Sequence, residues 1–490
     1  MTAIAESNFA GRLVQRLGPC SYLIDAATGR TISPGDLPRL IAAYGSSLTS
    51  AGLNKGDRVL IGCTLSPSST LVYLGAIYAG LVAVPVEDRG LTTSVEMLLE
   101  LTGAKAVWTE AGFRGGVATR GDSIIWLSGN FASEMPESMP PPAACAASDL
   151  AVLMATSGST GIPRFVMLSH GNLIANTEAI IRSQCLASDD RAMLILPVSY
   201  SFGASVMHTH LYQGGGVVFD RRFMFPDKVL HAVAQFSCTT FAGVPTVYNV
   251  LLRRSHIRQI AMPSLKRFLQ AGGGLATQNI REMRAGFPLI KFYVMYGQTE
   301  ASPRISCMDP ERWEEKAGSV GRPLDNLTIS IVDEQGNALP AGQVGELLVK
   351  GPSISPGYWN APEATGRVFR DGWLRTGDFA RQDAEGYLWI EGRKSAFLKM
   401  RGMRVSFAEV EERVASISGV YECATSSVNH PEAGEALVLF IVPDQGARIV
   451  VEEVRRHLPV HWVLDSIHMV SELPKTSTGK IARSALSVRT

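Results

Sequence analysis

The sequence lacks the patterns that mark disulfide-rich, zinc-binding and membrane-spanning proteins. Its seven cysteines are scattered over 490 residues without a Cys-x-x-Cys pair, which argues against a disulfide framework and against a zinc site. No stretch approaches the roughly eighteen uninterrupted apolar residues of a membrane helix, so we predict no membrane span. The first residues also lack the basic start and apolar core of a signal peptide. We therefore expect a cytoplasmic protein.

A charge bias is also missing. The chain has 46 Lys and Arg residues against 45 Asp and Glu residues, so the composition gives no reason to expect nucleic acid or an anionic membrane as a partner. Hydrophobic residues make up 46% and charged residues 19%, which is typical of a folded globular protein. A chain of this length is too long for one core, and we expect more than one domain.

The order of the patterns predicts an α/β fold. Strand-like and helix-like segments alternate through the first two thirds, as in RVLIGCTL, SSTLVYLGAIYAG and LVAVPVE, which is typical of layered parallel α/β subdomains. From about residue 324 the pattern changes to short strands with turns, which predicts a small β subdomain. We place the boundary of a small C-terminal α/β domain near residue 395, giving domains at 1–394 and 395–490.

Small hydroxyl residues and glycines fill ATSGSTGIPR (155–164), directly after the apolar run LAVLM. Such a loop can surround phosphate oxygens with its backbone N–H groups and hydroxyls. It is not a Walker loop, because the Lys-Ser/Thr pair of that motif is absent. Four further segments carry candidate chemistry: AGGGLA (271–276), YGQTEAS (296–302), WLRTGDFARQDAEGYLWIEGR (373–393) and LPKTSTGKIAR (473–483). Each of these segments alone has an ordinary structural explanation. It is improbable, however, that the loop and the four segments all arose independently in this order.

In combination, TSGSTGIP, YGQTE, RTGD, GR and GK resemble the adenylate-forming superfamily of acyl-CoA synthetases, peptide-synthetase adenylation domains and luciferases. The resemblance covers nearly the whole chain. It implies an enzyme that uses ATP and Mg²⁺, in which a carboxylic acid substrate attacks the α-phosphorus of ATP to give acyl-AMP and pyrophosphate. It also implies that a pantetheine thiol, of CoA or of an acyl or peptidyl carrier protein, then displaces AMP.

The resemblance assigns roles to individual residues. Lys480, on a mobile C-terminal domain, is expected to contact both the attacking carboxylate and the α-phosphate. Thr299 is expected near the α-phosphate, and Glu300 is expected to bind Mg²⁺, a cation that prefers oxygen ligands. Tyr296 is expected to stack on adenine, and Asp378 to accept hydrogen bonds from the ribose. The other implied positions are Thr156, Ser157, Gly158, Ser159, Thr160, Gly161 and Arg164 in the phosphate loop, Gly272, Gly273, Gly297 and Arg393 near the nucleoside, and Ser395, Lys399 and Gly402 for hinge motion and thiolation.

The acid pocket is expected to begin in PVSYSFGAS (197–205), again by resemblance. Gly203 stands where peptide-synthetase domains carry an Asp that pairs with the substrate's α-amino group. An amino acid would therefore bury its ammonium without a partner, which is unfavourable. Glycines on facing walls predict a deep apolar slot, which favours an aliphatic acyl chain ahead of an aryl acid. The expected lining is Tyr200, Phe202, Gly203, Phe241, Gly243, Val244 and Gly274.

Several positions depart from the superfamily pattern, among them Leu464, where relatives often have proline. The phosphate loop continues Pro163-Arg164-Phe165 where relatives usually read Pro-Lys-Gly, and we expect the bulk of Phe165 to alter the loop path. Ser395 stands at the hinge where relatives usually carry Asp or Lys. Phe165 and Ser395 leave open a non-catalytic protein that senses ATP or acyl-AMP. An amide-forming acyl-AMP ligase is a further alternative.

Overall fold

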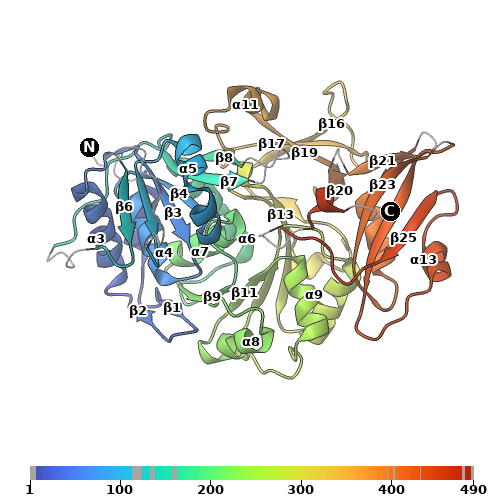
Figure 1. Ribbon diagram of the computed structural model, residues 1–490, viewed down its shortest axis with the longest axis horizontal. Coiled ribbons are helices and arrows are strands. Elements are labelled where there is room, and N and C mark those ends of the chain that lie inside the picture. The colour runs from blue at the N-terminus through green and yellow to red at the C-terminus, as the bar shows by residue number, and fades with distance from the viewer. Residues whose placement is uncertain are drawn as a thin grey trace.

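The computed structural model describes residues 7–112, 124–132, 138–156, 163–393, 396–400, 403–430, 432–476 and 481–486. Within these residues the strands form four sheets, two large ones in the first two thirds of the chain and two smaller ones after them (Figure 1). None of the described helices is long and apolar enough to cross a membrane.

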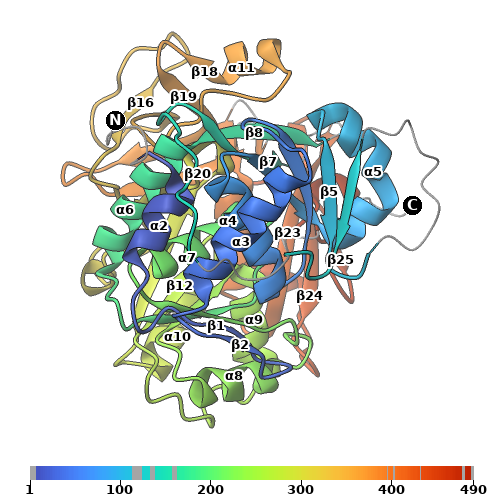
Figure 2. The same ribbon diagram turned by 90° about the vertical axis from the view of Figure 1, so that its left-hand side faces the viewer.

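The first large sheet has the strand order β6-β5-β3-β4-β7-β8. Its strands are parallel except for β7 and β8, which form an antiparallel pair. Figure 2 shows α5 beside β5 at the edge of this sheet. The elements are α3 (Leu37–Ser50), β3 (Arg58–Cys63), α4 (Pro67–Tyr78), β4 (Val82–Glu87), α5 (Asp88–Thr102), β5 (Ala106–Thr109), β6 (Ile125–Ser128), β7 (Leu150–Thr156) and β8 (Arg164–Ser169).

The second large sheet has the order β15-β14-β13-β12-β11-β9-β10-β1-β2, parallel from β13 through to β1. Its strands are β1 (Leu23–Asp25), β2 (Thr31–Ile32), β9 (Arg191–Leu194), β10 (Gly216–Phe219), β11 (Thr240–Gly243), β12 (Arg267–Gln270), β13 (Lys291–Gly297), β14 (Arg304–Cys307) and β15 (Arg322–Pro323). Its helices are α2 (Phe9–Arg16), α6 (His170–Gln184), α7 (Ser201–Tyr212), α8 (Pro226–Gln235), α9 (Pro245–Arg254) and α10 (Thr277–Gly286), with short 3₁₀ turns η1 (Thr299–Ala301) and η2 (Pro310–Arg312).

Helices α4 and α7 lie in the middle of the main core. Every residue of both helices is buried, and both are apolar on most of their circumference, as expected of helices with no solvent-facing side. Their burial explains why the sequence SSTLVYLGAIYAG lacks an amphipathic pattern. The predicted alternation of parallel strands and helices is therefore confirmed.

The last two sheets have separate cores. The first contains β16 (Thr328–Val332), β17 (Gly345–Lys350), β18 (Phe369–Arg370), β19 (Trp373–Gln382) and β20 (Leu388–Arg393), with α11 (Pro362–Val368). The second contains β21 (Phe397–Met400), β22 (Met403–Ser406), β23 (Val420–His430), β24 (Gly434–Pro443) and β25 (Leu464–Met469), with α12 (Phe407–Ala415), α13 (Val451–His457) and the turn η3 (Arg483–Ala485). The expected small β subdomain and small C-terminal α/β unit are both present.

The C-terminal sheet lies beside α9 (Figure 1). Both carboxylate oxygens of Glu412, in α12, accept hydrogen bonds from the backbone N–H of Thr277 at 3.0 and 3.2 Å. Since Thr277 is the first residue of α10, this carboxylate occupies the position of an N-terminal helix cap. Nearby, the Arg254 guanidinium lies over the Tyr421 ring, 4.5 Å from its centroid. One C-terminal carboxylate therefore caps a helix of the large domain.

Candidate active site

The end of β13 is the centre of the candidate site. Tyr296 and Gly297 are its last two residues, and the turn η1 places Thr299 and Glu300 immediately beyond them. Parallel strands of an open α/β sheet carry ligands beyond their carboxyl ends. Thr299 also reaches α7, since its hydroxyl lies 3.1 Å from the Ser201 hydroxyl. The predicted segment YGQTE thus occupies the edge at which such a site is expected.

Asp378 lies next to this edge, although it is distant in sequence. The Tyr296 hydroxyl donates a hydrogen bond to Asp378 Oδ2 at 2.5 Å, and Arg393 Nε lies 3.3 Å from Asp378 Oδ1. Asp378 is only 5% exposed. Burial of the Tyr296 hydroxyl, together with the Asp378 charge, raises the pKa of Tyr296 well above its ordinary value. The three side chains predicted to surround the nucleoside therefore form one hydrogen-bonded group, with Tyr296 as a donor at neutral pH.

Glu300 has a partner that the sequence did not reveal. Tyr358 donates a hydrogen bond from its hydroxyl to Glu300 Oε1 at 2.7 Å, and its ring is held by Phe369 in an edge-to-face contact. Burial and the Glu300 charge raise the pKa of Tyr358, so it stays a donor. Tyr358 lies in GYWNAPEAT, 58 residues from Glu300. Nothing in the spacing of these segments signals the contact.

Glu300 fits the role expected for a Mg²⁺ ligand. Mg²⁺ in nucleotide sites is usually held by one or two carboxylates, substrate phosphates and water. One Glu300 oxygen is oriented by Tyr358, which leaves the second carboxylate oxygen as a hard donor. No group of three or more His, Cys, Asp or Glu side chains suited to a metal occurs among the described residues. Glu300 is therefore suited to a metal that is bound together with phosphate oxygens and water.

The phosphate loop connects an antiparallel pair of strands. Thr156 ends β7 and Arg164 begins β8, and the two residues are directly paired. The Thr156 hydroxyl donates to the Arg164 carbonyl at 3.3 Å, while the Arg164 guanidinium lies over the Tyr358 ring at 6.0 Å. The predicted phosphate ligands Ser157, Gly158, Ser159, Thr160 and Gly161 lie outside the described residues.

Phe165 does not occupy the loop in the way the sequence suggested. It is the second residue of β8, pairs with Ala155 and is 3% exposed in an apolar core that includes Leu60 and Leu153. The bulk of Phe165 is therefore accommodated by the core beneath the sheet, whereas the path of the loop, on which the expectation bears, falls on residues 157–162, outside the described residues.

The predicted acid-pocket glycines are explained by close packing. A Cβ at Gly203 would collide with the backbone carbonyls of Leu196 and Pro197, and one at Gly243 would lie 2.7 Å from Val247 Cγ1. At Gly272, where φ is +88°, a Cβ would collide with the Tyr200 hydroxyl. Gly203 and Gly243 therefore do not create the deep slot that was expected, because neighbouring atoms already fill the space. Gly272, which was predicted near the nucleoside, is packed just as closely.

The remaining lining residues surround that packed region. Phe202 and Tyr200 meet edge to face with ring centroids 6.3 Å apart, and Phe241 and Val244 are buried. The Gly273 carbonyl accepts a hydrogen bond from Gln270 at 2.8 Å, whereas a Cβ at Gly274 would meet no neighbour within 4 Å. Gly297 packs so closely against the Pro303 carbonyl that no side chain fits there. The assignment of these residues stays a prediction, to the nucleoside site for Gly273 and Gly297 and to the acid pocket for the others.

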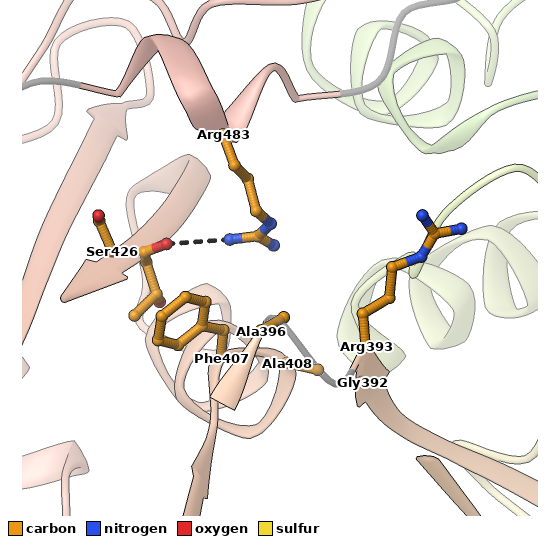
Figure 3. A pocket seen from close by; sticks show the side chains of 8 residues that line it. Gly392, Arg393, Ala396, Phe407, Ala408, Ser426 and Arg483 are labelled. Carbon is orange, nitrogen blue, oxygen red and sulfur yellow. Dashed lines mark hydrogen bonds between the residues drawn. The ribbon is translucent and has the colours of Figure 1, made fainter. Parts of the chain in front are cut away.

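A cavity of about 390 Å³ lies where the last two sheets meet, next to the expected hinge. Figure 3 shows Arg483 and Arg393 on two segments that border this region, with Ala396 between them and Phe407 below Arg483. Arg483 pairs with Glu411 at 2.7 Å, and Arg393 pairs with Asp378, so both guanidinium groups already have carboxylate partners. Lys399 lies in β21, whereas Ser395, Gly402 and Lys480 lie outside the described residues.

Family models match most of the chain. Residues 19–359 match the AMP-binding enzyme family, and residues 409–480 match the AMP-binding enzyme C-terminal domain. The first match contains β13, η1 and the strands around the phosphate loop.

Curated relatives and solved structures agree with these matches. The chain is 31% identical to a feruloyl-CoA synthase from Amycolatopsis over 93% of both chains, and 30% identical to a sulfoacetate–CoA ligase from Cupriavidus necator over 94% of this chain and 93% of that protein. The ATP-bound crystal structure of MatB from Rhodopseudomonas palustris is 27% identical, with a TM-score of 0.87 over 98% of this chain and 97% of that one.

Proposed function

Because the chain belongs to the AMP-binding enzyme family and is an adenylate-forming acid–thiol ligase, we propose that it converts an aliphatic carboxylic acid to acyl-AMP and passes the acyl group to a pantetheine thiol. The observation that carries this proposal is the cluster at the end of β13. There Thr299, Glu300 and the Tyr296–Asp378 pair converge from segments up to 82 residues apart. The thiol belongs to CoA or to the phosphopantetheine arm of a carrier protein.

In the first half-reaction the acid's carboxylate oxygen attacks the α-phosphorus of ATP, and the bond to the bridging oxygen of pyrophosphate breaks. Both reacting groups are anionic, so the protein contributes mainly positioning and charge neutralisation. Asp378 accepts hydrogen bonds from the ribose, and Thr299 lies beside the α-phosphate. A Mg²⁺ ion held by Glu300 and phosphate oxygens would reduce the negative charge that opposes attack. The proposed role of Lys480 is to neutralise charge on both the carboxylate and the α-phosphate with its ammonium group.

In the second half-reaction the thiol sulfur attacks the acyl carbonyl carbon and AMP leaves. Withdrawal of Lys480 by rotation about Ser395 would open a path for the pantetheine arm past Gly402. The contact between Glu412 and Thr277 lies between the two units that such a rotation would separate. This exposed contact supports the proposal that the interface between the two units can break and re-form during the reaction cycle.

The acid itself is open to direct test. Pyrophosphate release would be measured with Mg-ATP and aliphatic acids of increasing length, aryl acids and amino acids, without a thiol. We expect turnover with aliphatic acids and none with α-amino acids. Turnover confined to aryl acids would contradict the aliphatic assignment. Addition of CoA or a phosphopantetheinylated carrier protein to the active mixture then identifies the acceptor.

Lys480→Ala separates the two half-reactions. We expect this variant to lose nearly all acyl-AMP formation while it still transfers the acyl group of supplied acyl-AMP to the thiol. Equal loss in both half-reactions would contradict the role given to Lys480.

A further inference from the structure

Arg304 is a buried cation without a carboxylate partner in the described part of the chain. It is the first residue of β14 and is 2% exposed. Among the described residues, its guanidinium donates a hydrogen bond to Met295 Sδ and lies over the Phe202 ring, 5.1 Å from the ring centroid. No described Asp or Glu oxygen lies within ion-pair distance of it. Thioether sulfur is a weak acceptor, so the charge is poorly compensated.

The other buried arginine of the described residues shows the usual arrangement. Arg267 is 7% exposed and has its Nη1 2.7 Å from Asp190 Oδ2, a carboxylate that is itself buried. Removing a guanidinium from water is unfavourable unless an anion or several acceptors replace the water. In agreement, burial lowers the pKa of Arg304 to about 10. The contrast indicates that Arg304 is arranged for an anion that the described protein does not supply.

The backbone of Arg304 is held firmly in place. Asn176, 1% exposed in α6, accepts a hydrogen bond from the Arg304 N–H at 3.1 Å and donates to the Arg304 carbonyl at 2.9 Å. The same amide also donates to the Ala301 carbonyl at 3.2 Å. Arg304 is thus tied to the segment that contains Thr299 and Glu300, and its position relative to the reacting groups is fixed.

Contacts also place Arg304 beside the expected acid pocket and below the reacting edge. Its guanidinium lies over Phe202, which packs on Tyr200. Its hydrogen-bond partner Met295 precedes Gly297, the last residue of β13, by two positions. Two residues of extended strand span about 7 Å, so the strand residue that holds the guanidinium precedes the end of β13 by about that distance. Thr299, near which the reacting carboxylate is proposed to meet the α-phosphate, follows the end of β13, so Arg304 and Thr299 are placed to contact different parts of a bound acid.

We infer that the acid substrate carries a second anionic group, such as a carboxylate, at the far end of a short aliphatic chain, and that Arg304 binds it. The inference rests on the proposed function and defines its substrate class. On binding, the second anion replaces Met295 Sδ as the partner of the guanidinium, and the flexible methionine side chain gives way. Phe202 and Tyr200 pack against the methylene groups between the two acidic ends. Arg304 is then a specificity-determining residue.

The test compares dicarboxylic acids with monocarboxylic acids of the same chain length, using wild type, Arg304→Met and Arg304→Lys. Wild type should prefer the dicarboxylic acid in kcat/KM by about tenfold or more, as expected for a buried charge-assisted hydrogen bond. Arg304→Met should lose this preference and keep or gain turnover of the monocarboxylic acid. Arg304→Lys should retain part of the preference.

A purely structural role for Arg304 would lower the turnover of both acids equally in Arg304→Met, and that result would overturn the inference. So would a wild-type preference for the monocarboxylic acid. Thermal unfolding provides a reading without turnover: the dicarboxylic acid should raise the Tm of wild type in the presence of ATP and should not raise that of Arg304→Met. If no acid releases pyrophosphate but this difference appears, the proposed function fails and the anion site stands. If neither appears, both fail.

Discussion

The hydrogen bond from Tyr358 to Glu300 gives a sharp test of the metal-binding role assigned to that carboxylate. Tyr358→Phe removes the hydroxyl that lies 2.7 Å from Glu300 Oε1 and keeps the ring that packs on Phe369 and lies under Arg164. A hydrogen bond to a charged group contributes about 1.5–3 kcal/mol. Loss of such an orienting partner typically lowers metal affinity or activity about 10- to 100-fold. We expect an effect in that range.

The assay is the initial rate of pyrophosphate release at saturating ATP and acid while the Mg²⁺ concentration is varied. Tyr358→Phe should require about 10- to 100-fold more Mg²⁺ for half-maximal rate. The control is Tyr78→Phe, because the Tyr78 hydroxyl also donates one hydrogen bond of 2.7 Å, to the Pro140 carbonyl, away from the end of β13. A Mg²⁺ dependence that is the same for wild type and both variants would refute the reasoning.

Two further predictions concern the domain contact and the buried histidines. Glu412→Gln weakens the cap on Thr277 by at most about 1 kcal/mol because the contact is exposed. We therefore expect a nearly unchanged Tm but a several-fold change in the ratio of the two domain orientations, measured by fluorescence transfer between labelled domains. An unchanged distribution of orientations would contradict this. Burial lowers the pKa of His208 to about 3 and of His210 to about 4. Since the unfolded chain binds these protons first, stability should fall as pH drops from about 6.5, by about 2 kcal/mol for each residue at pH 5. Denaturant unfolding at pH 7 and pH 5 measures this, and equal stabilities would exclude it.

Much of the site could be predicted because each chemical group lies in a short segment with a distinctive composition. Tyr296, Thr299 and Glu300 are adjacent in one segment, and the end of a parallel strand delivers them together. Asp378 and Arg393 face each other because they are paired across β19 and β20. The antiparallel pairing of these two strands, which are close in the sequence, accounts for that contact.

Other features depend on packing between distant segments and have no local signal. Tyr358 can reach Glu300 because its segment runs beside β8, where the Met167 N–H donates a hydrogen bond to the Gly357 carbonyl. The glycine-rich composition around Phe165 suggested a loop, but β8 already begins at Arg164. Arg304 is a single charged residue in a strand, and only the structure shows that it is buried with no carboxylate partner among the described residues.

The central claim is that the chain joins a carboxylate to the α-phosphate of ATP. A rapid-quench experiment with enzyme, Mg-ATP and acid, without thiol, followed by mass spectrometry, tests it most directly. The account predicts one acyl-AMP and one pyrophosphate per active site, formed together and only when the acid is present. Formation of ADP and phosphate, or pyrophosphate without acyl-AMP, would contradict it.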